Sequence, residues 1–283
     1  MNIAFLIDNS YAEQLCVTLA SVLKNDKHNT FFNIYVLDGG ISDKNKEKIC
    51  KLKNFKPFNV EFINIDISLF DKSPVRYHLK ALNYARILLP SLLTCDKVLF
   101  LDCDLLVLDD LTDFYNEDFE GKYACVVKER LSDESFFKRH IKELGLKSYF
   151  NAGVMLLNLE KMRNHNIQEL CFKFLSEQPD KIVLLDQCVL NFAFNDNVKF
   201  ISTRYNFQYK LNVSKKIKNP AIIHFVGKEK PYFGYAHPYE NLYYHYLKLT
   251  PFRISFFKFK QRMWKMFYPK FIKRIWIIFS CMI

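Results

Sequence analysis

Glycine and proline are scarce in this chain of 283 residues, with 7 and 9 copies. This scarcity excludes a collagen-like or low-complexity chain, and no repeat of solenoid length is present. The eight cysteines are scattered without a CxxC pair, which excludes an encoded zinc site or disulfide framework and indicates reduced thiols. Because 50% of the residues are apolar and 25% are charged, the chain is able to bury a sizeable core.

Signals for export or membrane crossing are also missing. The N-terminal stretch MNIAFLIDNS has no basic segment and turns polar after one short apolar run, unlike a signal peptide. The longest apolar run near the C-terminus begins at Ile275 and covers about nine residues, whereas a bilayer requires ~20. The sequence therefore predicts a cytoplasmic protein that is soluble or peripheral to a membrane.

Acidic residues are absent from 252–283, where eight basic residues alternate with large aromatic side chains and both tryptophans. The net charge is +11 for the whole chain and only +3 for the first 251 residues. Aromatic rings at headgroup depth and cations facing anionic lipid are typical of a segment in the bilayer interface. We therefore predict a globular domain over 1–251 and a helical tail over 252–283 that attaches to an anionic membrane surface.

Two other readings of the tail are a helix packed on the globular domain with a solvated basic face, and a nucleic-acid-binding segment. Nucleic-acid binding is disfavoured because the first 251 residues are nearly neutral and contain no nucleic-acid module. We therefore expect no nucleic-acid partner.

Short apolar runs alternate with helical patterns along the chain. Strands are predicted at 2–7, 31–38, 58–65, 97–101, 122–127 and 221–226, with a further apolar run at 152–159. Helices are predicted at 11–24, 42–53 (with Ser42 as N-cap), 79–89, 134–144, 166–177 and from Asp186 onward. This alternation predicts an α/β fold whose mostly parallel sheet carries helices on both faces. Ligands of such sheets bind beyond the carboxyl ends of the strands, where Asp8 and Asp102 lie.

The strongest chemical signal is the segment 97–108, KVLFLDCDLLVL. In extended backbone Asp102 and Asp104 point to one side and Cys103 to the other. Two neighbouring carboxylates between apolar runs repel each other unless a cation neutralises them, and their hard oxygens suit Mg²⁺ or Mn²⁺. The alternative is a polar turn between strands.

His224 lies in a second apolar strand, AIIHFVG, where it could be either a core residue or a ligand. The residues that follow favour a ligand-binding role, since Gly227 allows close approach of the backbone and Lys230 offers a charge for phosphate. Two carboxylates and one imidazole favour Mn²⁺ over Mg²⁺.

The chain resembles the retaining glycosyltransferase family 8, and in particular its bacterial α-galactosyl- and α-glucosyltransferases that build lipooligosaccharide. The matching stretches, in the family's order, are FLIDNSYAEQLCVTLASV, IYVLDGGIS, YARILLP, CDKVLFLDCDLLV, FNAGVMLLNLEKMR, LLDQCVLN and HFVGKEKPY. They cover residues 1 to about 240. The resemblance implies a GT-A-type, Rossmann-like mixed and mostly parallel sheet in a catalytic domain over 1–251.

The resemblance also implies a role for each matching residue. The uracil of a UDP-sugar would be received by Asp8 and Tyr11, and the phosphates would be contacted by Gly227 and Lys230. Mn²⁺, or alternatively Mg²⁺, would be held against the diphosphate by Asp102, Asp104 and His224. The transferred hexose would be surrounded by Arg86, Asn151, Ala152, Gly153, Asp186 and Gln187, with His78 near the acceptor.

The implied reaction moves galactose or glucose from the UDP-sugar to a lipid-linked glycan acceptor of lipopolysaccharide or lipooligosaccharide, at the inner face of the cytoplasmic membrane. Asp186 and Gln187 are the catalytic candidates. An amide oxygen is a poor nucleophile, so both a covalent intermediate at Gln187 and front-face attack by the acceptor stay open. The alternatives are a non-catalytic nucleotide-sugar or glycan-binding protein, a membrane-surface scaffold, and a self-glucosylating enzyme similar to glycogenin.

The chain departs from the family pattern at several positions. Ser10 replaces an asparagine, Leu184 and Val226 replace acceptor-pocket residues, and an acidic acceptor contact has no clear counterpart around 125–131. The acceptor is therefore not predicted.

Overall fold

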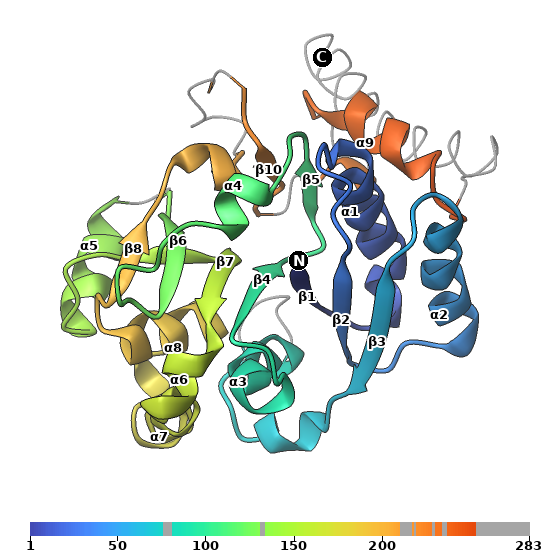
Figure 1. Cartoon of the computed structure of the whole chain (residues 1–283). Coiled ribbons are helices and arrows are strands. Elements are labelled where there is room, and N and C mark those ends of the chain that lie inside the picture. The colour runs from blue at the N-terminus through green and yellow to red at the C-terminus, as the bar shows by residue number, and fades with distance from the viewer. Residues whose placement is uncertain are drawn as a thin grey trace, which may run out of the picture.

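A seven-stranded sheet forms the centre of the protein, which is described here by a computed structural model. The structure describes residues 1–75, 81–130, 134–209, 217, 219–227, 230–233 and 237–252. The strands are β1 (Asn2–Ile7), β2 (Asn33–Asp38), β3 (Asn59–Asn64), β4 (Lys97–Leu101), β6 (Ala124–Lys128), β7 (Phe150–Asn158) and β8 (Val198–Phe200). Their order is β3-β2-β1-β4-β7-β6-β8 (Figure 1). Strand β7 is antiparallel to both neighbours and the other pairs are parallel, so the predicted mixed, mostly parallel sheet is confirmed.

Helices connect the strands as the alternating pattern predicted. They are α1 (Ala12–Asn25), α2 (Asp43–Cys50), α3 (Leu89–Leu92), α4 (Thr112–Tyr115), α5 (Glu134–Glu143), α6 (Leu159–Asn164), α7 (Ile167–Glu177), α8 (Leu185–Phe194) and α9 (Glu240–Leu247). The helix predicted at 79–89 forms as the 3₁₀ helix η4 (Ala81–Leu88), followed by α3. Ser42 occupies the N-cap position of α2, but its side chain makes no capping hydrogen bond.

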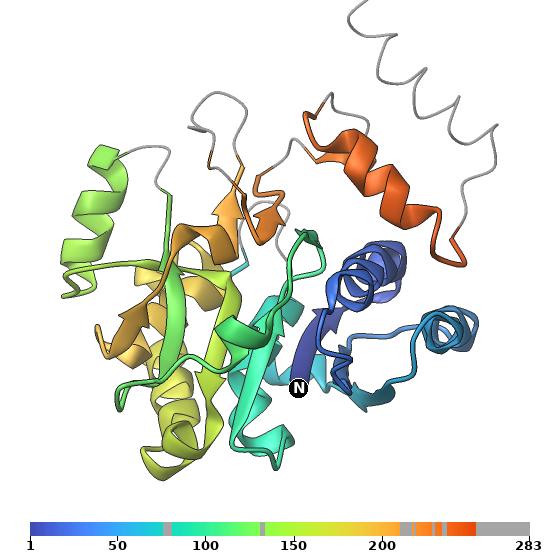
Figure 2. The same ribbon diagram turned by 45° about the horizontal axis from the view of Figure 1, so that its top comes forward.

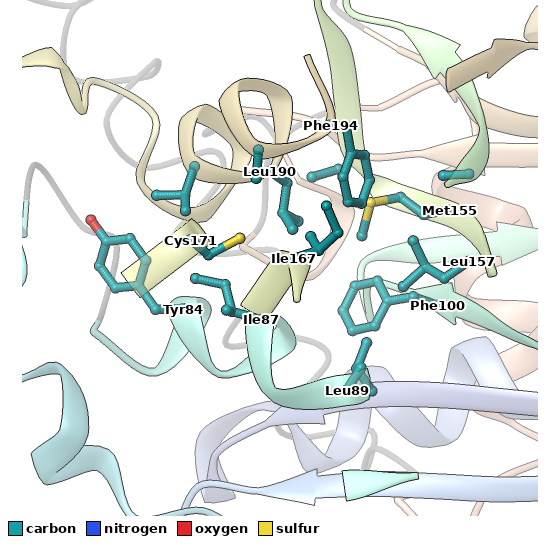
Figure 3. Packing of buried hydrophobic residues seen from close by; sticks show 14 of the residues in the cluster. Tyr84, Ile87, Leu89, Phe100, Met155, Leu157, Ile167, Cys171, Leu190 and Phe194 are labelled. Carbon is teal, nitrogen blue, oxygen red and sulfur yellow. The ribbon is translucent and has the colours of Figure 1, made fainter. Parts of the chain in front are cut away.

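The strands bury alternate side chains on the two faces of the sheet, because successive side chains of a strand point to opposite sides. On one face Phe100, Met155 and Leu157 pack against Ile87 and Leu89 and against helices α7 and α8 (Figure 3). On the other face, Leu99 and Leu101 belong to a cluster that includes the apolar side of α1. Each fully buried large side chain contributes roughly 1.5–3 kcal/mol to stability, so both faces hold the sheet in place.

A second, three-stranded sheet was not predicted. It consists of β5 (Leu105–Val107), β10 (Ile222–His224) and β9 (Phe207–Gln208), in the order β5-β10-β9. Residues of this sheet pack with Val17 of α1 and with Tyr243 of α9, and Figure 2 shows α9 lying alongside α1. Strand β10 pairs with β5, and this pairing holds β10 beside the turn that connects β4 to β5.

No helix in the described part of the chain combines the length and apolar character needed to cross a bilayer. The predicted tail lies outside the described residues except for Phe252, whose ring centroid is 4.2 Å from Nζ of Lys48. The division at Pro251 and the attachment of the tail to a membrane therefore stay predictions.

Helix α1 braces the turn between β4 and β5. The buried Thr18 hydroxyl lies 2.8 Å from the carbonyl oxygen of Cys103 and 2.9 Å from that of Leu105, so its proton is shared between them. One turn further along, Ser21 Oγ accepts a hydrogen bond of 2.9 Å from the amide of Val107. The turn between β4 and β5 is therefore fixed to the helix by side-chain hydrogen bonds.

We expect Thr18→Val to lower the free energy of unfolding by ~1–3 kcal/mol, because two buried carbonyls lose their donor while the side-chain volume is kept. The matched control is Thr112→Val. The buried Thr112 hydroxyl faces the Asp110 carboxylate and, among the described residues, contacts no carbonyl of the turn between β4 and β5, so we expect this variant to lose less stability than Thr18→Val. Urea denaturation measures both, and equal losses in the two variants would contradict the bracing role of Thr18.

Candidate metal and sugar-donor site

One edge of the large sheet collects the polar residues. Strands β1, β4 and β6 run in the same direction, so their carboxyl ends meet at this edge and are followed by Asp8, Asp102 and Glu129. The antiparallel strand β7 begins at the same edge and brings residues 150–153 to it. The expectation that Asp8 and Asp102 lie at strand ends on one edge is confirmed.

Asp102, Asp104 and His224 converge although the histidine lies far away in sequence. One ligand atom of each residue lies within 4.8 Å of those of the other two. Nε2 of His224 is 3.3 Å from Oδ1 of Asp104 and 3.9 Å from Oδ2 of Asp102. Pairing of β10 with β5 places His224 opposite Leu105 and thereby beside Asp104.

Each of the two carboxylates has one oxygen engaged by a cationic side chain and the other turned toward His224. Oδ1 of Asp102 accepts a hydrogen bond of 3.0 Å from Nη2 of Arg86, and Oδ2 of Asp104 contacts Nζ of Lys230. Burial raises the pKa of Asp104, but the charge of the neighbouring Lys230 outweighs burial and holds that pKa below its ordinary value. Asp104 is therefore ionised and suited to bind a cation.

The residues fit a divalent cation. Oδ1 of Asp104 is buried and accepts no hydrogen bond within the described residues, so this oxygen is free to act as a ligand. A Cβ atom on Gly153 would lie 2.4 Å from Cε1 of His224 and 2.6 Å from Oδ2 of Asp102, so only glycine leaves the space between them open. Two carboxylates and one imidazole are a donor set for Mn²⁺ and related ions.

Arg86 joins the metal-ligand candidates to the predicted sugar site. Nε of its buried guanidinium lies 3.0 Å from Oδ2 of Asp186. Nη1 of the same group donates a hydrogen bond of 2.9 Å to the carbonyl oxygen of Ala152. The nearby carboxylates outweigh burial and raise the pKa of Arg86. Because Arg86 shares its charge between Asp102 and Asp186, it does not offset the burial of Asp186, whose pKa is raised to about 6.

Gln187 is held at both ends of its amide. Its Oε1 accepts a hydrogen bond of 3.0 Å from the amide of Ala152, and its Nε2 donates one of 3.1 Å to Oε2 of Glu129. Helix α8 begins at Leu185 with φ of 43°, in the left-handed region that costs a bulky residue roughly 1–3 kcal/mol. This strained start directs Asp186 and Gln187 toward the sheet edge.

The residues predicted to receive the nucleotide border the metal-ligand candidates. The Asp8 side chain accepts a hydrogen bond of 2.9 Å from the amide of Ser10. Burial raises the pKa of the half-buried Tyr11, and the charge of Lys230 opposes this rise. Gly227 has φ of 80°, a left-handed conformation that favours glycine.

Sequence reasoning missed Glu129 and Asn206. Oε2 of Glu129 accepts a hydrogen bond of 2.8 Å from Nδ2 of Asn151, and Oδ1 of Asn206 lies 2.9 Å from Nδ1 of His224. Glu129 follows a strand end as Asp102 does, a signal that could have identified it, whereas nothing in the local sequence marks Asn206. His78, predicted near the acceptor, lies outside the described residues.

The chain is similar to known proteins in both sequence and fold. Residues 2–234 match the family model described as "Glycosyl transferase family 8". General stress protein A of Bacillus subtilis is 29% identical over 270 residues, covering 88% of this chain and 94% of that protein. Lipopolysaccharide 1,2-glucosyltransferase of Escherichia coli K12 is 25% identical, covering 83% of this chain and 74% of that protein.

Two crystal structures of the galactosyltransferase LgtC resemble this chain. The complex with donor and acceptor sugar analogs has a TM-score of 0.78 and 26% identity, covering 93% of this chain and 100% of LgtC. An LgtC active-site mutant with glutamate in place of glutamine has a TM-score of 0.79 and 26% identity, covering 94% and 99%. The chain belongs to glycosyltransferase family 8 and has the GT-A fold of LgtC; it is a sugar-transferring enzyme related to lipopolysaccharide glucosyl- and galactosyltransferases.

The raised pKa of Asp186 makes stability depend on pH. The folded chain holds this proton up to about pH 6, whereas an unfolded aspartate loses it near its ordinary pKa of 3.8. The contribution of Asp186 to stability is therefore fully present below about pH 4 and is lost as the pH rises to 6. Relative to Asp186→Asn, we expect the wild-type free energy of unfolding to fall by about 2 kcal/mol between pH 4 and pH 7. Urea denaturation in metal-free buffer measures this difference, and a constant difference or one of opposite sign would contradict the assignment.

Proposed function

We propose that this chain is a retaining hexosyltransferase that moves galactose or glucose from a UDP-sugar to a glycan acceptor, with Mn²⁺ as its metal and Mg²⁺ as the alternative. The observation that carries the proposal is the convergence of Asp102, Asp104 and His224 beside the buried cation of Lys230. Such a cluster suits a diphosphate bridged to the protein by a metal ion, because divalent ions of this class are commonly shared with substrate phosphates.

Each proposed site residue has a task in this reaction. Asp102, Asp104 and His224 would hold the metal, which when bound supplies Lewis-acid stabilisation of the departing diphosphate. Lys230, together with the backbone at Gly227, would bind the phosphate oxygens. The uracil would lie between Asp8 and the ring of Tyr11.

The hexose would lie against the start of β7 and the start of α8. Arg86, Asn151, Ala152 and Gly153 would form this part of the pocket. Asp186, ionised at neutral pH because its pKa is about 6, would bind sugar hydroxyls and favour the positive charge that develops at the anomeric carbon. The sugar would then lie between the metal-ligand cluster and Gln187.

Gln187 is proposed as the group on the opposite face of the sugar. LgtC also has a glutamine in its active site, since one of its structures is of an active-site mutant with glutamate in place of glutamine, and we propose that Gln187 corresponds to that residue. Because Oε1 already accepts the Ala152 amide proton, and amide oxygens are weak nucleophiles, we favour front-face attack by the acceptor hydroxyl over a covalent intermediate. In that route a phosphate oxygen of the donor takes the acceptor proton, and configuration is retained.

The acceptor is proposed to be a lipid-linked glycan of the lipopolysaccharide class at the inner face of the cytoplasmic membrane. Its class is suggested by the relatives, among them the lipopolysaccharide 1,2-glucosyltransferase. The basic aromatic tail over 252–283 would bring the catalytic domain over 1–251 to this surface.

We expect Asp102→Asn and Asp104→Asn each to lower Mn²⁺-dependent hydrolysis of the UDP-sugar ~100-fold or more, because loss of a charged ligand removes several kcal/mol of leaving-group stabilisation. UDP release from UDP-galactose and UDP-glucose measures this without an acceptor. The control is Asp96→Asn, whose side chain is 80% exposed. Near wild-type, metal-dependent rates in folded Asp102→Asn or Asp104→Asn would refute the metal assignment.

The tail is tested by ending the chain after Phe252, which keeps the contact of that ring with Lys48. We expect the full chain to sediment with phosphatidylglycerol vesicles and the shortened chain to stay in the supernatant, because eight cationic side chains are removed. Mn²⁺-dependent donor hydrolysis should stay within about twofold of the full chain. Unfolding of the shortened chain would instead favour a helix packed on the domain.

A further inference from the structure

Three side chains connect the end of β6 to the imidazole of His224, and we call Glu129, Asn151 and Asn206 the amide relay. Nδ2 of Asn151 donates a hydrogen bond of 2.8 Å to Oε2 of Glu129. Nδ2 of Asn206 donates one of 2.9 Å to Oδ1 of Asn151, and Oδ1 of Asn206 lies 2.9 Å from Nδ1 of His224. All members except Glu129 are buried, so water does not compete for these bonds.

The direction of every bond in the relay is determined at Asn151. A carboxylate oxygen only accepts hydrogen bonds, so the Asn151 amide must turn its NH₂ group toward Glu129. The backbone amide of Gly153 only donates, and it lies 3.1 Å from Oδ1 of Asn151. Two neighbours of opposite kind therefore fix this amide in one orientation.

The orientation passes from Asn151 to the histidine. Because Oδ1 of Asn151 only accepts, Asn206 must offer it Nδ2 and so turns its own oxygen toward His224. An amide oxygen only accepts, so Nδ1 must carry the imidazole proton. In the neutral imidazole, Nε2 is then left with a lone pair that points at the inner oxygens of the two aspartates.

We propose that the amide relay positions the metal site by holding His224 in the tautomer whose Nε2 is free to bind a cation. This inference rests on the proposed function only in naming the cation Mn²⁺. The same oxygen of Glu129 also accepts a hydrogen bond from Gln187, so one carboxylate orients the metal ligand and the residue on the far side of the sugar. Hydrogen bonds that orient a ligating histidine contribute roughly 10–100-fold to metal affinity.

The first test measures the Kd of Mn²⁺ by titration followed by electron paramagnetic resonance. We expect Asn206→Ala to raise the Kd roughly 10–100-fold, because the acceptor for Nδ1–H is lost. Asn206→Asp keeps an oxygen facing Nδ1 but loses the Nδ2 donor to Asn151, so it should recover a part of the affinity. The control Asn25→Ala removes a half-buried amide that bonds Val107 and Tyr246, outside the relay, and should keep the wild-type Kd.

The second test is made on the wild-type chain, so it does not depend on the folding of a variant that lacks a buried side chain. Long-range ¹H–¹⁵N correlation at about pH 9, in metal-free buffer, reports which nitrogen of a neutral imidazole is protonated. We expect the His224 signal, identified by its loss in His224→Gln, to show the proton on Nδ1.

A proton on Nε2, or equal Mn²⁺ affinities of the wild type and Asn206→Ala, or equal losses in Asn206→Ala and Asn206→Asp, would overturn the relay. A wild-type chain that binds no Mn²⁺ would instead contradict the proposed function, and the tautomer would still decide for or against the relay.

Discussion

Two carboxylates and an imidazole share one small space in this protein, and neighbouring cationic side chains offset the repulsion between those carboxylates. Two like charges about 4 Å apart cost roughly 4 kcal/mol near a protein surface. Arg86 and Lys230 neutralise the outer oxygens of Asp102 and Asp104, which leaves the inner oxygens directed at His224. The inner oxygens face the imidazole and no lysine or arginine of the described residues, and this is the basis on which we propose a metal-dependent transferase.

The fold supplies this arrangement through the junction of its two sheets. Strand β4 belongs to the large sheet and β5 to the small one, so the aspartates lie in the turn where the chain passes between the sheets. Thr18 fixes this turn from α1, and pairing of β5 with β10 brings His224 to it. Parallel strand ends gather the proposed donor-site residues at the same edge, so the residues that we propose to bind nucleotide, metal and sugar lie where the two sheets and α1 meet.

The sequence allowed the strands, the mixed sheet and the metal-ligand cluster to be predicted, because each leaves a local pattern. Asp102 and Asp104 stand between two apolar runs, and His224 interrupts a third. The small sheet could not be predicted, because β9 has two residues and gains its order only by pairing with β10. Asn206 was missed for the same reason, since a single polar residue at the end of η6 (Thr203–Asn206) acquires a role only when Asn151 and His224 reach it in space.

The central claim is that Asp102, Asp104 and His224 bind one divalent cation together. Electron spin echo envelope modulation of the Mn²⁺-loaded wild-type chain tests it most directly, because the modulation reports a nitrogen bonded to the ion. The account predicts one bound Mn²⁺ per chain with coupling to a histidine ¹⁴N that disappears in His224→Gln. Bound Mn²⁺ without nitrogen coupling, or coupling that persists in His224→Gln, would contradict it.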